Sequence, residues 1–211
     1  SAASDVYKRQ VQYQTDKIEA ERTIQMGNGN RGNTMIIKNG LVFTPEGKFE
    51  KKDFYIEGEY VAKETTDNKE VEAEGCYVIP GLVDIHFHGC VRHDMCDGTE
   101  ESIQALADYE AANGVLAICP ATMTIPEEEL FQAMNAAREH KNGKGADLVG
   151  INMEGPFVNK EKKGAQKEED IKLADVELFH KLQEAAGGLI KLVDLAPETD
   201  CLLYTSDAAD E

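Results

Sequence analysis

Two hydrophobic patterns follow one another along the chain. Between Met35 and Ile79, short apolar runs alternate with polar residues and are separated by Gly, Pro and Asn. This alternation is typical of strands joined by tight turns. We expect a small antiparallel sheet, with strands within 35–43, 53–64 and 71–79.

The second pattern begins at Pro80 and predicts strands and helices in turn. Helix starts are indicated by Thr99, Pro126 and Asp175, each followed by an amphipathic segment. Alternating strands and helices favour a parallel sheet with crossover connections. The strands are expected within 82–89, 115–122, 147–155 and 189–198, and the helices within 99–114, 125–143 and 175–188.

Four strand–helix units do not close a (β/α)8 barrel, which has eight strands over about 250 residues. A doubly wound sheet needs only four or five strands and stays open as an alternative. No Gly-x-Gly-x-x-Gly follows any predicted strand, which weakens the nucleotide-binding form of that fold. A truncated barrel of about four units is favoured, because the two ends of the chain indicate that the natural protein continues past about residue 200.

Residues 1–10 and 201–211 are related through DNA. A back-translation of SAASDVYKRQ has a reverse complement that, shifted by one base, encodes CLLYTSDAA and the start of an acidic codon. Both tails are therefore interpreted as translations of one inverted adapter and excluded from the fold. We expect the natural protein to start at Met35 and to continue past about residue 200, with 11–34 being translated upstream DNA or a disordered extension.

Composition narrows the function classes. The 211 residues include 22 Lys and Arg against 40 Asp and Glu, a net charge of −18. A surface this acidic argues against nucleic acid and anionic membranes as partners, because both need basic patches. With no leader segment and irregularly spaced cysteines, we expect a cytoplasmic protein with reduced thiols.

His86 and His88 are the first candidates for chemistry. They are two residues apart near the end of a predicted strand, so both side chains should leave the same face. The carboxyl ends of parallel strands carry the active sites of such folds. Two imidazoles in this arrangement suit a divalent metal such as zinc.

Glu154 closes the third predicted strand of the parallel sheet, in the segment 151–156 (INMEGP). By parity it shares a face with Asn152, while Ile151 and Met153 point the other way. A carboxylate at this edge needs a cation or hydrogen-bond donors. We therefore expect Glu154 to converge with the two histidines on a shared metal.

Four segments together resemble the N-acetylglucosamine-6-phosphate deacetylases of the amidohydrolase superfamily, from about Met35 to Glu198. They are PGLVDIHFHG (80–89), MEGP (153–156), KGAQ (163–166) and LAPE (195–198). The resemblance implies metal-dependent hydrolysis of the acetamide of a small phosphorylated amino sugar by a cytoplasmic enzyme, with a homodimer as the full-length form. It implies that residues 35–79 form part of a β-sandwich and residues 80–200 the first half of the barrel.

The resemblance also assigns residues. It implies that His86, His88 and Glu154 hold one or two divalent ions, zinc or another ion such as iron, and that Ala165 and Gln166 touch the amino sugar. The acid–base aspartate and further ligand histidines of the family would follow Glu198. We therefore expect this chain alone to be inactive and marginally stable.

Two alternatives stay open. One is another amidohydrolase, such as a dihydroorotase-like or adenine-deaminase-like enzyme, against which the carboxylate of Glu154 argues. The other is a non-catalytic metal-binding barrel, which the absence of an aspartate after the last strand of the full-length gene would favour.

Overall fold

The computed structural model describes residues 34–57, 60–65 and 69–199, and these separate into two compact units. The first unit comprises the described residues up to Leu82 and the segment Ala112–Gly114, and the second comprises the remaining residues from Val83 on. The predicted adapter tails, 1–10 and 201–211, and the segment 11–34 except its last residue lie outside the described residues.

The first unit contains a sheet of five strands around a long central strand, β1 (Met35–Phe43). Antiparallel neighbours follow on one side, where β1 pairs with β2 (Phe49–Glu57) and β2 with β3 (Tyr60–Ala62). On the other side, β4 (Glu70–Glu72) and β5 (Tyr77–Val78) both run parallel to β1. The predicted antiparallel sheet is therefore wrong in part, because the chain crosses from the β3 edge to the far side of β1 before it pairs again.

The second unit alternates strands and helices. Its parallel strands pair in chain order, with β9 (Val115–Ile118) beside β10 (Asp147–Leu148) and β11 (Ile151–Glu154) beside β12 (Ile190–Asp194). Main-chain hydrogen bonds from Asn152 N to Pro120 O and from Thr122 N to Asn152 O, both 3.0 Å, join these two pairs. The other elements are β6 (Leu82–Asp84), α2 (Glu100–Ala112), α3 (Glu127–Glu139) and α4 (Val176–Ala185), of which only the end residues Leu82 and Ala112 belong to the first unit.

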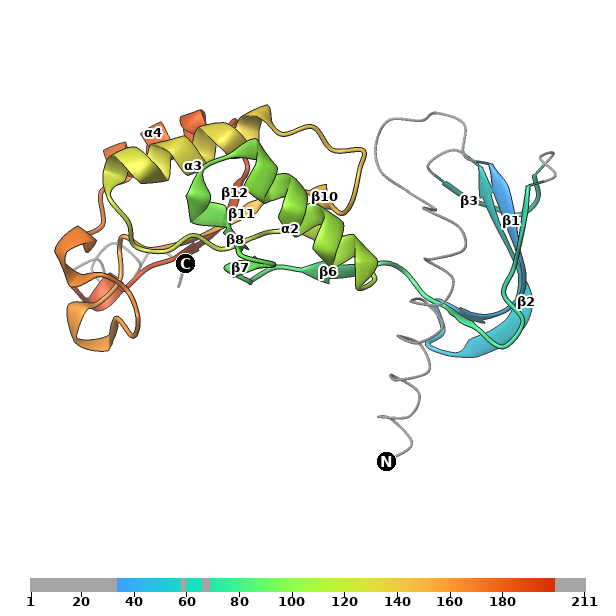
Figure 1. The fold of residues 1–211 in the computed structure, drawn as a ribbon. Helices are drawn as coiled ribbons and strands as arrows, with labels where there is room; N and C mark the ends of the chain where they lie inside the picture. Colours follow the sequence, from blue (N-terminus) through green and yellow to red (C-terminus); the bar gives the residue numbers. More distant parts are fainter. Residues whose placement is uncertain (1–33, 58–59, 66–68, 200–211) are drawn as a thin grey trace. The chain divides into compact units, whose positions relative to one another are not determined.

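Three helices, α2, α3 and α4, lie along one side of these strands (Figure 1). Their apolar faces and the strands enclose a core in which Leu106, Met134 and Leu182 are fully buried. Strand residues such as Val83 and Leu192 remain exposed. The structure confirms the α/β class, whereas a truncated barrel remains a prediction.

Helix starts follow the predicted signals. The Thr99 hydroxyl accepts from Ser102 N at 3.1 Å, and the Asp175 carboxylate accepts from Leu178 N at 3.0 Å. Pro126 precedes α3, which has three glutamates in its first turn, where they suit the helix dipole. Local side-chain chemistry therefore decides where these helices begin.

Short elements that the sequence did not predict lie in the loops. They are the hairpin β7 (Gly89–Cys90) and β8 (His93–Asp94), and the 3-10 turns η1 (Met95–Asp97), η2 (Lys160–Lys162), η3 (Glu168–Asp170) and η4 (Pro197–Thr199). In the described part of the chain, no helix has the length and apolar character needed to cross a membrane.

Candidate metal centre

His86 and His88 lie in an extended segment directly after β6. The sequence placed them within a strand that runs to residue 89, but β6 ends at Asp84. The Asp84 carboxylate accepts a hydrogen bond from His86 N at 3.0 Å, which satisfies a main-chain group outside the strand ladder. The two rings are nevertheless close neighbours, with centroids 5.3 Å apart.

Glu154, the last residue of β11, faces both rings. Its Oε2 lies 3.2 Å from His88 Nε2 and 3.4 Å from His86 Nε2. Among the described residues, these three form one group whose ligand atoms all lie within 4.8 Å of one another. The structure therefore brings together the three side chains that the sequence singled out.

The direction of Glu154 follows from the alternation along β11. Ile151 and Met153 are fully buried in the core between strands and helices, so Asn152 and Glu154 point to the other face. Gly155 then turns the chain at φ +78°, and a Cβ there would clash with the Thr124 hydroxyl. Glycine is therefore required where the chain leaves the site.

Asn152 supports His86 from beneath. It is 5% exposed, and its Nδ2 lies 2.9 Å from His86 Nδ1 and 3.4 Å from Ile85 O. Asn152 Oδ1 and His88 Nδ1 are buried without a hydrogen-bond partner among the described residues. The Nδ1 side of each imidazole is thus enclosed, which leaves its Nε2 side facing Glu154.

The group fits a divalent ion. Zinc binds imidazole nitrogen and carboxylate oxygen at about 2.0–2.2 Å, so two ligands of a tetrahedral ion lie about 3.3–3.6 Å apart. The separation of Glu154 Oε2 from His86 Nε2, 3.4 Å, lies within that spacing, and its separation from His88 Nε2, 3.2 Å, is slightly shorter. The donor set of two imidazoles and one carboxylate also suits zinc or iron.

Ala165 and Gln166 lie in the loop between η2 and η3, and their environments differ. Ala165 is exposed, whereas Gln166 is 4% exposed. Gln166 Nε2 donates to Glu154 Oε1 at 2.7 Å, so this loop residue contacts the carboxylate directly. Loop residues show no periodicity, so the sequence contains no signal for the contact between Gln166 and Glu154. The place of Asn152 at the site, in contrast, was detectable, because strand alternation puts it on the same face as Glu154.

The remaining histidines lie apart from this group. His93 Nδ1 is 3.3 Å from Ser102 Oγ, and His180 is exposed on α4. His140 follows α3, a position where a cation would suit the helix dipole. Burial instead lowers the pKa of His140, although Glu100 and Asp147 raise it, so the neutral ring is favoured.

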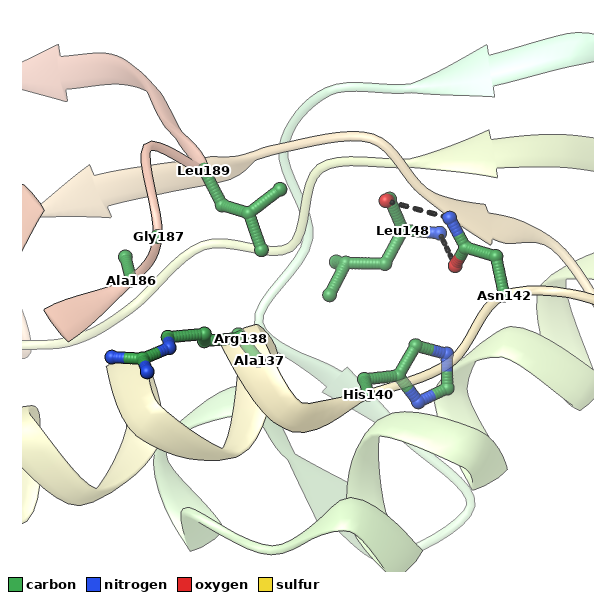
Figure 2. A pocket seen from close by; sticks show the side chains of 8 residues that line it. All are labelled: Ala137, Arg138, His140, Asn142, Leu148, Ala186, Gly187 and Leu189. Atoms are coloured by element: carbon green, nitrogen blue, oxygen red, sulfur yellow. Dashed lines mark hydrogen bonds between the residues drawn. The ribbon is translucent and has the colours of Figure 1, made fainter. Parts of the chain in front are cut away.

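A cavity of about 230 Å³ lies beside His140 (Figure 2). Its other lining residues come from the end of α3, from β10 and the segment before it, and from the turn after α4. They are Ala137, Arg138, Asn142, Leu148, Ala186, Gly187 and Leu189. His86, His88 and Glu154 take no part in it.

The cysteines offer no competing metal group. Cys76, Cys90, Cys96 and Cys119 are free thiols, and the described residues contain no cluster of them that could hold an ion. Burial raises the pKa of Cys96 to about 12, which keeps that thiol protonated at neutral pH.

Comparison with known proteins identifies relatives of this arrangement. The N-acetylglucosamine-6-phosphate deacetylase of Bacillus subtilis is 37% identical over 171 residues, which cover 78% of this chain and 42% of the relative. The enzyme of the same name from Lysinibacillus sphaericus is 28% identical over 172 residues, 78% of this chain and 44% of the relative. No protein-family model matches the chain.

Solved structures show the same fold. The N-acetylglucosamine-6-phosphate deacetylase of Pasteurella multocida aligns with a TM-score of 0.71 at 20% identity, over 84% of this chain and 48% of that one. A variant of the Mycobacterium smegmatis enzyme, in complex with N-acetyl-D-glucosamine-6-phosphate, aligns with a TM-score of 0.67 at 21% identity, over 82% of this chain and 46% of that one.

The chain spans less than half the length of the curated relatives named above. This coverage is consistent with the prediction that it corresponds to an N-terminal portion of such a protein. By sequence and by fold, the chain is thus homologous to part of the N-acetylglucosamine-6-phosphate deacetylases, hydrolases that act on an amide bond.

Proposed function

We propose that this chain supplies the first part of a metal-dependent deacetylase that hydrolyses N-acetylglucosamine 6-phosphate to glucosamine 6-phosphate and acetate. The observation that carries the proposal is the convergence of His86 Nε2, His88 Nε2 and Glu154 Oε2. The relatives named above give the substrate class.

In this proposal His86, His88 and Glu154 hold a divalent ion, zinc or iron, with one or two ions per subunit. Such an ion, when bound, polarises a carbonyl oxygen and lowers the pKa of water. The three side chains contribute position and charge: Glu154 neutralises part of the positive charge, and the enclosed Nδ1 sides direct each Nε2 to the site.

The proposal places the amino sugar near the loop that carries Ala165, which is exposed beside the buried Gln166. Proton transfer to the leaving amine needs an acid–base group. Among the described residues, the metal group contains a single carboxylate, that of Glu154, which the ion occupies. We therefore expect the acid–base aspartate in the remainder of the enzyme and no turnover by this chain alone.

A chimera tests the function. Residues 35–199 are joined to the remaining part of the Bacillus subtilis relative, and acetate release from N-acetylglucosamine 6-phosphate is measured with added zinc or ferrous iron. The chimera is expected to release acetate, and its Glu154→Gln variant is expected to lose that activity. The control Asp194→Asn changes a carboxylate that pairs in register with Glu154 on β12 but lies outside the metal group.

Two results would count against the proposal. A folded chimera that binds metal but releases no acetate would refute the deacetylase function. Acetate release by the present chain alone would refute its inactivity. Size-exclusion chromatography of the chimera tests the proposed homodimer, and fractionation of cells that express it tests the cytoplasmic location.

A further inference from the structure

Gln166 is the one polar side chain of the loop between β11 and α4 that is buried at the metal centre, with 4% of its surface exposed. Its main chain is held by Lys163, whose carbonyl accepts from Gln166 N at 3.1 Å and whose Nζ donates to Gln166 O at 3.0 Å. The loop is therefore closed on itself at the point where Gln166 turns inward.

Every polar atom of the Gln166 amide has a partner within the protein. Nε2 donates to Glu154 Oε1 at 2.7 Å and lies 3.6 Å from the sulfur of Met123. Oε1 accepts from the main-chain N–H of Thr124, a residue that is 2% exposed. The orientation of the amide is thereby fixed, because turning it over would place an oxygen against the carboxylate and an N–H against an N–H donor.

The two carboxylate oxygens of Glu154 have different partners. Oε1 is held by Gln166, and Oε2 faces His86 and His88. A hydrogen bond to a ligating carboxylate fixes its orientation and tunes the metal, as outer partners of metal ligands commonly do.

We propose that Gln166 is a positioning residue that holds Glu154 so that a single oxygen, Oε2, serves the metal site. The inference rests on the proposed function only in that it needs an ion at the histidine pair. It gives Gln166 a different role from the amino-sugar contact expected from the sequence, since its amide has no free donor left for a sugar.

The two roles predict different results for the metal. A side chain that only touches the sugar leaves metal binding unchanged, whereas one that positions Glu154 changes both metal affinity and the mode of carboxylate binding. The test measures Zn²⁺ binding to this chain by isothermal titration calorimetry and the absorption spectrum of the Co²⁺-loaded chain, which reports coordination number. Infrared difference spectra report whether a carboxylate binds through one oxygen or two.

The main variant is Gln166→Met, which keeps the length of the side chain and removes both hydrogen-bonding ends. We expect Zn²⁺ affinity to fall by about 10- to 100-fold, as for other lost outer partners. We also expect the Co²⁺ spectrum and the carboxylate bands to shift toward two-oxygen binding. The matched control is Lys167→Met, an exposed neighbour that should behave as the wild type.

Gln166→His tests rescue, because a ring N–H can again donate to Glu154; its affinity should lie between those of the wild type and Gln166→Met. Thermal unfolding in EDTA identifies folded variants. If Gln166→Met does not fold, Gln166→Ser replaces it, since it removes the same donor without adding an apolar side chain.

The outcomes separate this inference from the proposed function. A folded Gln166 variant with wild-type affinity and an unchanged Co²⁺ spectrum overturns the positioning role and leaves the deacetylase proposal intact. A wild-type chain that binds no Zn²⁺ overturns the positioning role, which needs an ion at the histidine pair, and leaves the function to the chimera. A chimera that binds metal but releases no acetate overturns the function alone, because metal affinity still reports on Gln166.

Discussion

Histidines lie near both ends of the parallel strands in the second unit, and their surroundings are opposite. At the carboxyl ends, the side chains of His86 and His88 are 47% and 36% exposed and share the Glu154 carboxylate. At the amino ends, His140 is 8% exposed, and neither of its ring nitrogens has a hydrogen-bond partner among the described residues.

This difference separates the candidate metal ligands from a packing residue. An imidazole can hold an ion where an anion faces it and solvent can deliver the ion, and the carboxyl-end pair meets both conditions. His140 lines a cavity with mainly apolar neighbours, where desolvation favours the neutral ring. We therefore expect the same residue type to bind an ion at one end of the sheet and to pack in the core at the other.

The largest effect should come from removing the shared anion. Glu154→Gln keeps the shape of the side chain but loses its charge, and Zn²⁺ affinity should fall by more than about 100-fold, beyond the usual loss of an outer partner. Isothermal titration with this chain measures it. Asp194→Asn, at the adjacent strand end, should bind like the wild type, and an equal loss in both variants would show that no specific ligand is involved.

At the amino ends of the strands, a substitution is expected to change stability and not Zn²⁺ binding. Leu148 is 5% exposed beside His140, and Leu148→Ala should lower the free energy of unfolding by about 2–5 kcal/mol through lost burial and an enlarged cavity. Urea denaturation in EDTA measures this loss. Leu173→Ala, at an exposed position, is the control with little expected change. A Leu148 variant with weakened Zn²⁺ binding would contradict the separation of the two ends.

Loss of the contact between Asn152 and His86 should lower Zn²⁺ affinity less than loss of the Glu154 charge does. Asn152→Leu removes the contact to His86 Nδ1, and Zn²⁺ affinity should fall by about 10- to 100-fold, because an outer partner no longer fixes the ring. Titration calorimetry of this chain tests it, with Asn135→Leu on the exposed face of α3 as the control. An unchanged affinity in a folded Asn152 variant would mean that packing alone orients His86.

Much of the fold was visible in the sequence because its signals are local. The strand over 35–43 appears with the predicted bounds, and Thr99 and Asp175 cap helices as expected. Strand direction in the first unit was not visible, since β4 could pair with β1 in either direction without changing the alternation. The short reach of β6 depends on Asp84, whose carboxylate captures a main-chain N–H.

The candidate site also contains residues that the sequence could predict and a contact that it could not. His86, His88 and Glu154 were predictable because strand parity and the carboxyl ends of the strands set their direction. Their role as metal ligands stays a prediction. The contact of Gln166 with Glu154 was not predictable, because it depends on how a loop without periodicity folds back over the end of β11.

The smallest effect concerns the pH dependence at His140. Burial lowers its pKa from the ordinary value of 6.5, so below that value the unfolded chain takes up a proton more readily than the folded one. The contribution of His140 to stability is therefore fully present above pH 6.5 and is lost as the pH falls toward its lowered pKa. Glu100 and Asp147 partly oppose the shift, which keeps the effect modest.

Between pH 5 and 8 in EDTA, His140→Leu should show a shallower rise of unfolding free energy with pH than the wild type, as measured by urea denaturation. Parallel curves would mean that His140 titrates equally in both states, and the contrast between the two ends of the strands would then rest on hydrogen bonding alone.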